Sequence, residues 1–409
     1  MAAKNTTPAA ITLPSNFKIS AVDSKFTLTP SLPTTPPTLG VLANFTGTFT
    51  GTGFNSIFRP NSVPPTTTTF PNPVTPPPPQ PPSENVLELN LTTETLSFSG
   101  SLGGVPNRGL EGQNDIFLNG VPYVQAISDV ANPATGNADG TPIAIHLEPG
   151  LWMNVPATHT NPVLGNSLVR MASIPHGTTI NAQGLAPTGS FAGPPTFPVV
   201  DMTPFVINNN QRVPIRFASQ TASNNDTPRL PQDLTKFIAA GTITQAILDN
   251  PNTVLRNANV GKTITNTTVF TVSTAPVAPE LGGGTSNIAF LQGNAAGTTG
   301  NADAAQMTAT FWIETVQHKI VIPIFKPGQP PLKIPAPASR QGDPVPVFLI
   351  DPPTEITQSI TIVVTSTQIQ YSQVVNLNFA GLIWPHVSVA TLIPTTAQTV
   401  PPSVWDQVK

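Results

Sequence analysis

Residues 41–60, VLANFTGTFTGTGFNSIFRP, alternate apolar with small or polar side chains, and this pattern decides the fold class. Alternation of this kind places successive side chains on opposite faces and is typical of a half-buried β-strand. Gly47, Gly51 and Gly53 interrupt the run at positions where we expect bulges or bends. The stretch therefore predicts a strand at the beginning of a β-rich domain.

Alternating runs of the same kind recur along the chain at intervals of ~8 to 15 residues, as in sandwiches and barrels. We expect turns at residues 92–95, at Asn119-Gly120 and at Pro149-Gly150, where turn-forming residues separate the runs. The sequence predicts a mainly β protein. Its strands either close into one large antiparallel barrel or form two packed barrel or sandwich halves. The second group of predicted strands comprises residues 262–274, 286–293, 305–317, 318–325, 345–352, 358–379 and 386–394.

The chain divides into four segments by composition. Residues 1–40 are rich in Thr and Pro and are expected to form a surface arm. A first β half spans residues 41–230 and contains a Pro-rich loop at 60–82, because proline cannot donate to a strand ladder. Residues 231–260 show apolar side chains at helical spacing and predict two or three short helices, which cover a barrel mouth or connect the halves. The second β half, residues 261–409, is expected to complete one domain.

Charged residues make up 9% of the chain, against about 25% in an average soluble protein. The net charge of −3 offers nothing that would attract a nucleic acid, and so few surface charges favour a homo-oligomer. The absence of cysteine excludes disulfides and thiolate metal sites. We see neither a secretory signal nor a membrane-spanning segment, so a cytoplasmic location is expected.

Residues 144–177 contain three of the five histidines of this charge-poor chain. In a strand His146 and Glu148 share one face, so they are candidates for a catalytic acid–base pair. Arg170 follows in the next predicted strand and is a candidate to stabilise negative charge. His176 lies at a strand end, where its side chain is aimed with little freedom, and is a candidate ligand-binding residue.

Aromatic and basic residues elsewhere extend this set of candidates. Trp152 follows the His146 strand, Trp312 lies in a later predicted strand, and Trp384 and His386 flank one proline. Together with Arg108 they are candidate ligand-binding residues, because small-molecule sites combine apolar and aromatic walls with a few placed polar groups.

Structural explanations compete with each of these functional ones. His146 is equally well explained as a core histidine bonded to a carbonyl group, and Glu148 as the partner of a structural ion pair with Arg170 or Arg108. The tryptophans are explained by core packing. The sequence contains no motif of a serine hydrolase, a zinc protease or a nucleotide-binding loop, and no local histidine spacing that predicts a metal site.

Several segments resemble microbial proteins that are described as haem-binding and that carry a lipocalin-like (calycin, nitrobindin-style) β-barrel. The resemblance spans residues 41–394 and is carried by FTGTFTGTGFNSIFRP, NDIFLNGVPYVQ, HLEPGLWMNVPAT, RMASIPHG, TATFWIETVQ and YSQVVNLNFAGLIWPHVSVATL. It implies a barrel that holds a hydrophobic ligand such as haem, with His146, His176 or His386 as the axial ligand.

Three classes of function remain open. The first is a barrel that binds a hydrophobic small molecule, with haem as the cofactor that the resemblance implies. The second is an enzyme in the same cavity that uses His146 and Glu148 as acid and base, with Arg170 or Arg108 beside the developing charge. The third is a structural protein that assembles through its Pro- and Thr-rich segments. We favour the first.

Overall fold

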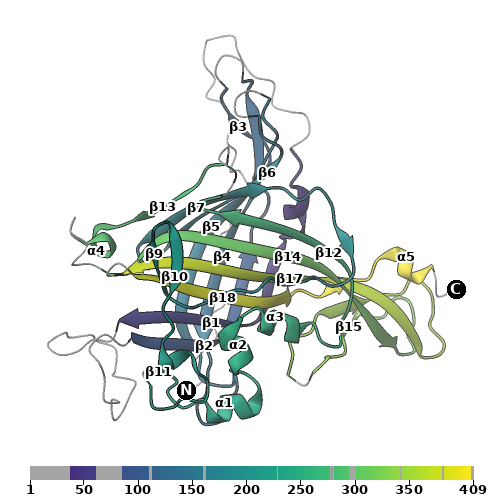
Figure 1. Ribbon diagram of the computed structural model, residues 1–409. Coiled ribbons are helices and arrows are strands. Elements are labelled where there is room, and N and C mark those ends of the chain that lie inside the picture. Colours follow the sequence, from purple (N-terminus) through teal and green to yellow (C-terminus); the bar gives the residue numbers. More distant parts are fainter. Residues whose placement is uncertain are drawn as a thin grey trace.

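Ten antiparallel strands close into a single barrel in the computed structural model of the chain (Figure 1). The structure describes residues 37–406 except 61–84, 110–112, 160–162, 228, 277, 279–280, 294–300, 341 and 380–381. Most of the predicted N-terminal arm and of the Pro-rich loop thus lies outside the described residues. The predicted β-barrel is confirmed, and strands of both halves contribute to it.

The order of strands around the barrel follows the order in the chain, and the last strand pairs with the first. β1 and β18 close the barrel through eight successive residue pairs, from Phe49 opposite Pro394 to Ser56 opposite Val387. The barrel strands are β1 (Gly47–Pro60), β2 (Asn85–Phe98), β4 (Ile116–Asp129), β5 (Ile143–Val155), β6 (Ser167–Ile174), β7 (Thr178–Leu185), β12 (Thr263–Ser273), β14 (Asp303–Ile322), β17 (Ile360–Phe379) and β18 (Leu382–Pro394).

The two halves of the chain also meet between β7 and β12, where the ladder has a single residue pair, Gln183 opposite Ser273. Two short strands pair with the parts of β7 and β12 that do not pair with each other. β13 (Gly284–Asn287) pairs with β7, and β8 (Phe191–Ala192) pairs with β12. The remaining short elements are β3 (Val105–Asn107), β9 (Phe205–Asn208), β10 (Gln211–Pro214), β11 (Arg229–Leu230), η1 (Gly40–Asn44), η2 (Ala218–Gln220) and α4 (Ala289–Gln292).

Aromatic rings fill the barrel interior next to the end that η1 covers. Phe45, just after η1, stacks on Phe98 at 4.6 Å between ring centroids. Trp152 meets the ring of Phe311 edge-on at 5.2 Å, and Phe270 stacks on Phe311. A ten-stranded barrel is wider than the eight-stranded barrels that ordinary side chains fill, so large rings are needed here.

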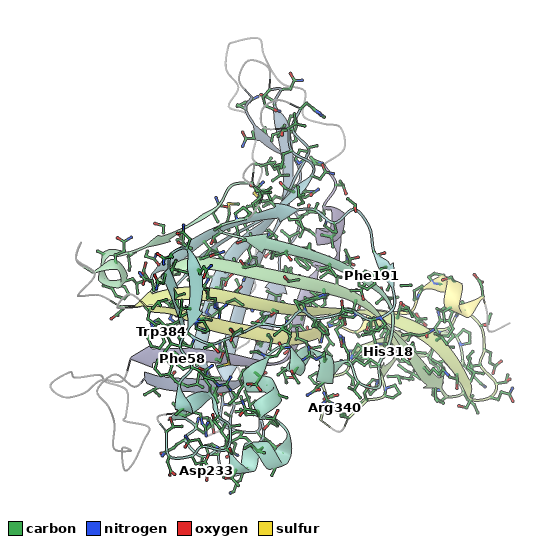
Figure 2. The ribbon with its side chains drawn as sticks, viewed as in Figure 1. Phe58, Phe191, Asp233, His318, Arg340 and Trp384 are labelled. Atoms are coloured by element: carbon green, nitrogen blue, oxygen red, sulfur yellow. The ribbon has the colours of Figure 1, made fainter. Side chains whose placement is uncertain are left out.

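The predicted helical segment forms three helices, α1 (Thr235–Ala240), α2 (Gln245–Asp249) and α3 (Thr253–Ala258). They pack on the outer face of β1, β2 and β18, so they cover the wall of the barrel rather than a mouth (Figure 1). Trp384 lies in this outer layer, where its ring stacks on Phe217 and lies near Phe58 (Figure 2). Both faces of this part of the sheet are therefore buried.

β14 and β17 continue beyond the barrel and carry a second small core. Their ends pack against a three-stranded sheet and a short C-terminal helix, with Phe348 and Ile350 among the buried side chains. These elements are β15 (Leu332–Pro335), β16 (Val347–Ile350), β19 (Gln398–Thr399) and α5 (Pro402–Trp405).

Several local predictions are wrong because strands are longer than the sequence indicates. β2, β4 and β5 run without interruption through the turns predicted at residues 92–95, Asn119-Gly120 and Pro149-Gly150. Gly120 instead allows β4 and β5 to lie close together, since a Cβ at this position would lie 2.4 Å from the carbonyl oxygen of Trp152. The strands predicted at residues 305–317 and 318–325 are one strand, β14, and residues 286–293 contain both β13 and α4.

Candidate functional site

A layer of polar side chains lies inside the barrel between the aromatic core and the opposite end. At its centre Arg170 of β6 donates from Nη2 to Glu148 Oε1 of β5 at 2.6 Å and from Nη1 to Gln373 Oε1 of β17 at 2.7 Å. Nε donates to Tyr123 Oη at 2.8 Å. The guanidinium carbon also lies 5.8 Å from the ring centroid of Trp152. Arg170 therefore joins the polar layer to the aromatic core.

Glu148 is fully buried and remains ionised because its partners outweigh the cost of burial. Burial by itself raises the pKa of Glu148, but the Arg170 charge and the hydrogen bonds from His146 and Tyr123 lower it to about 2. Burial likewise favours loss of the Arg170 proton, but Glu148 raises the pKa of Arg170 above its usual range. The two side chains form a permanent buried ion pair.

A glycine in β5 makes room for the tyrosine that bridges this pair. Gly150 faces the barrel interior between Glu148 and Trp152, and a Cβ at this position would lie 2.5 Å from Cζ of Tyr123. Without a side chain at residue 150, the Tyr123 ring lies across β5 and its hydroxyl donates to Glu148. The Pro149-Gly150 pair therefore positions a side chain instead of turning the chain.

Glu94 of β2 is a second buried carboxyl group in the same layer, with no cation bonded to it. Tyr371 Oη donates to Glu94 Oε2 at 2.6 Å, and Gln125 Nε2 donates to the same oxygen at 3.2 Å. Burial raises the pKa of Glu94 to about 7, although these two hydrogen bonds oppose the rise. The protonation of Glu94 thus changes near neutral pH.

Three of the predicted histidines gather at the barrel end beyond this layer. His146 lies near the beginning of β5, His176 in the turn between β6 and β7, and His386 near the beginning of β18. The ring centroids of His146 and His176 are 5.6 Å apart, and both rings interact electrostatically with His386. We call this set the histidine mouth of the barrel. It lies at the left of Figure 1, at the same end as α4.

The histidines differ in the partners that they already have. His146 Nε2 lies 3.3 Å from Glu148 Oε2, so this ring belongs to the buried network. His386 Nδ1 lies 3.1 Å from the carbonyl oxygen of Ser56, which only accepts, so Nδ1 carries the proton and Nε2 has the lone pair. Burial lowers the pKa of His386 to about 4, so the ring is neutral at pH 7. A neutral histidine whose other nitrogen donates to a carbonyl is the usual form of a metal ligand.

The other candidate residues do not reach the histidine mouth. Trp312 packs on the outer face of the barrel beside Phe197, and Trp384 packs against Phe58 and Phe217, so the structure groups neither of these candidate ligand-binding rings with the three histidines. Arg108 is exposed beyond β3 and pairs with Asp115 at 2.7 Å. Trp152 does face the interior, but it belongs to the aromatic core.

Sequence reasoning missed five members of the polar layer: Glu94, Tyr123, Gln125, Tyr371 and Gln373. One signal was available, because the chain has only two tyrosines and both donate to the buried glutamates of this layer. Glu94 was hidden by its position in a Thr-rich segment that resembles a turn.

No family model, curated protein or solved structure matches this chain. Among the described residues, no three or more His, Asp or Glu side chains are grouped so that they could hold a metal ion. No helix in the described part of the chain is long and apolar enough to cross a membrane.

Proposed function

We propose that the protein binds a small, partly apolar molecule at the histidine mouth of the barrel. The observation that carries the proposal is the convergence of His146, His176 and His386, from three separate segments, above the buried Arg170–Glu148 pair. Histidine is scarce in this chain, and a ligand site needs a few placed polar groups at the edge of an apolar wall. β14 and β17 supply such a wall from Met307 and Val375 and their neighbours.

Haem is the ligand that we favour. The aromatic core and the histidine mouth differ in whether they could hold it. The aromatic core does not accommodate a porphyrin, because the rings of Phe45, Trp152 and Phe311 occupy it at contact distance. At the histidine mouth, the donor chemistry of His386 suits a haem iron, since Nε2 carries the lone pair and bonds to none of the described residues. Bound there, haem would supply an iron centre able to bind small ligands or transfer electrons.

Titration with haemin tests this proposal on the full chain. We expect a shifted Soret band that saturates, and an affinity at least about tenfold weaker after His386→Ala, because the protein bond to iron is lost. His318→Ala is the matched control, since His318 lies outside the barrel and its loss leaves the histidine mouth unchanged. A wild-type spectrum that does not change, or equal affinities for both variants, contradicts haem binding through His386.

The second candidate function is acid–base catalysis at the same end of the barrel. Glu94 is better suited to exchange the proton than the His146–Glu148 pair that the sequence suggests. Glu148 stays ionised at every physiological pH, so it orients His146 and does not exchange a proton itself. Glu94, with a pKa of about 7, can both hold and release a proton near neutrality. Burial also raises the pKa of Glu314 to about 7, so this residue contributes to the same spectra. Infrared difference spectra between pH 6 and 8 should contain carboxyl intensity that decreases in Glu94→Gln, and the part that remains should decrease in Glu314→Gln. If Glu94→Gln leaves the spectrum unchanged, Glu94 does not titrate in this range.

We also propose that the protein self-associates, because so few of its residues are charged. Light scattering should give a mass above that of one chain, and the mass of a single chain over the whole accessible concentration range contradicts self-association.

A further inference from the structure

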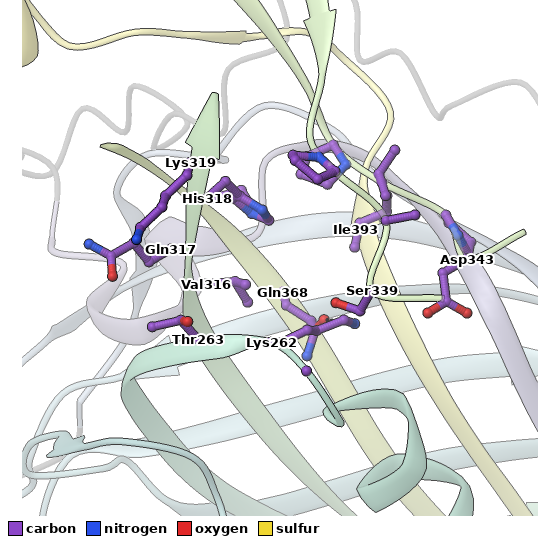
Figure 3. A pocket seen from close by; sticks show the side chains of 17 residues that line it. Lys262, Thr263, Val316, Gln317, His318, Lys319, Ser339, Asp343, Gln368 and Ile393 are labelled. Atoms are coloured by element: carbon purple, nitrogen blue, oxygen red, sulfur yellow. Dashed lines mark hydrogen bonds between the residues drawn. The ribbon is translucent and has the colours of Figure 1, made fainter. Parts of the chain in front are cut away.

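A cavity lies outside the barrel, between its wall and the segment that joins β15 to β16. It measures about 380 Å³, enough for about twelve water molecules, and falls within the range of small-molecule pockets. The strands β12, β14 and β17 form its floor, and residues 337–339 and 343–346 form its opposite wall (Figure 3). The cavity shares no lining residue with the histidine mouth.

One wall of the cavity is apolar and stiff. Pro337, Pro344 and Pro346 line it together with Val345, and Val316 and Ile393 contribute from the barrel side. Proline side chains lose almost no conformational freedom when a ligand packs on them. This wall is suited to the flat or branched apolar body of a small molecule.

The polar part of the cavity is dominated by the ammonium group of Lys262, at the beginning of β12. Lys262 Nζ donates to Gln368 Oε1 at 2.6 Å, and Gln368 in turn donates to Glu314 and to Asn259. In the described part of the chain no carboxylate oxygen lies within 4 Å of Lys262 Nζ. The cation is mostly buried and bonded to a neutral amide, so a negative group in the cavity would stabilise it.

The neighbouring groups add hydrogen-bond donors. Asp343 and Glu314 attract the Lys262 charge from beyond 4 Å, but burial outweighs them and lowers the pKa of Lys262. His318 Nε2 lies 2.9 Å from Ser366 Oγ, and burial lowers the pKa of His318 to about 4, so its ring is neutral. The hydroxyl group of Ser339 faces the same space (Figure 3). Asp343 pairs with Arg340 at 3.3 Å. One buried ammonium with one or two hydroxyl donors suits a single carboxylate better than a phosphate, which calls for more donors.

We propose that this cavity binds a small organic acid, with its carboxylate on Lys262 and its apolar body against the proline wall. The proposal does not depend on the histidine mouth. It predicts a preference for monocarboxylates with an aromatic or branched apolar part over both neutral analogues and inorganic anions.

The test uses 4-fluorobenzoate as the probe and fluorine NMR as the readout, on the full chain. We expect saturable broadening and a shift of the fluorine signal, and binding at least about tenfold weaker for 4-fluorobenzyl alcohol, which lacks the charge. Lys262→Met should weaken binding of the acid by a similar factor. Lys326→Met is the matched control, because Lys326 is exposed and is not among the residues that line the cavity, and it should change the affinity by less than about threefold.

A second variant covers the case in which loss of Lys262 disturbs the fold. Ser339 is exposed, so Ser339→Trp leaves the buried cores untouched while its ring fills the cavity, and it should abolish binding. The circular dichroism of this variant should match that of the wild type. Wild-type affinity in either the Lys262 or the Ser339 variant overturns the proposal. It is also overturned if the acid and the alcohol bind equally well, or if neither binds.

Discussion

Glu148→Gln removes one charge from the centre of the barrel and should be among the most destabilising substitutions of similar size in this chain. Gln keeps the volume and one acceptor oxygen, but it leaves Arg170 buried without a counter-ion. Breaking a buried pair from one side typically costs about 3–5 kcal/mol. The net depression of the Glu148 pKa from 4.5 to about 2 corresponds to about 3 kcal/mol in favour of the folded ionised form, a sum of the burial cost and the effects of Arg170, His146 and Tyr123. The two figures agree, so we expect a loss of about 3 kcal/mol in the free energy of unfolding.

Urea unfolding at pH 7 measures this loss, and a double-mutant cycle with Arg170→Met isolates the pair. Each single variant should lose about 3 kcal/mol, and the double variant should lose at least ~2 kcal/mol less than their sum, because no unpaired charge remains. Additive losses, or a loss below ~1 kcal/mol for Glu148→Gln, would refute the assignment of a coupled buried pair.

The pH dependence gives an independent check with a definite sign. The folded-state pKa of Glu148 is depressed, so its contribution to stability is complete above the unfolded value of 4.5 and disappears as the pH falls towards about 2. The difference between wild type and Glu148→Gln should therefore shrink over this interval. A difference that is constant from pH 5 to pH 2 contradicts the pKa assignment.

Three further substitutions test other parts of the framework. Glu94→Gln should reduce the fall in stability between pH 4.5 and 7, because the folded carboxyl keeps its proton there while the unfolded one loses it, and Glu314 should contribute part of the fall that remains; urea unfolding across this range measures the slope. Gly150→Ala should cost about 1–3 kcal/mol through collision with Tyr123 and alter the near-ultraviolet circular dichroism, whereas Gly189→Ala, in open space, should do neither. Arg229→Met should cost at least ~3 kcal/mol and accelerate amide exchange around residues 219–232, since the guanidinium binds several backbone carbonyl groups there; unchanged exchange contradicts this role.

The sequence predicts the strands well because alternation is a local property, but it does not say which face of a strand points inward. Trp312 and Trp384 illustrate the limit: in most antiparallel sheets one face is solvated, and large apolar side chains then mark the interior. Here α1–α3 and the segments beside them bury the outer face as well, so Trp312 packs outside beside Phe197 while the adjacent Phe311 belongs to the aromatic core, and Trp384 packs on Phe217 of the same outer cluster. Only the three-dimensional position of the helices resolves this ambiguity.

Turn signals fail in β2, β4 and β5 for a related reason. Gly120 and Gly150 are residue types that favour turns, but pairing with long neighbouring strands overrides this local preference. Because these residues have no side chain, other groups pack closely against them. Glu94 could not be identified as functional because a carboxyl group in a supposed turn is expected to be solvated. Its raised pKa depends on burial beneath Tyr371 of β17, a contact between residues 277 positions apart.

The order of layers along the barrel axis limits where a ligand can bind. From the end that η1 covers, the interior passes from aromatic rings, through the Arg170 network, to the histidine mouth. A molecule that entered from the histidines would meet Arg170 and Glu148 next, and further entry would separate two buried charges at a cost of several kcal/mol. The Arg170 network therefore forms the floor of the proposed site and limits how deeply a ligand can enter. Because Glu94, with a pKa of about 7, belongs to that floor, a change of pH across neutrality alters the charge beneath the site while Glu148 stays ionised. Ligand affinity at the histidine mouth should accordingly follow the ionisation of Glu94, and it should lose that pH dependence in Glu94→Gln. Affinity of the wild type that is independent of pH between 6 and 8 would place the ligand elsewhere.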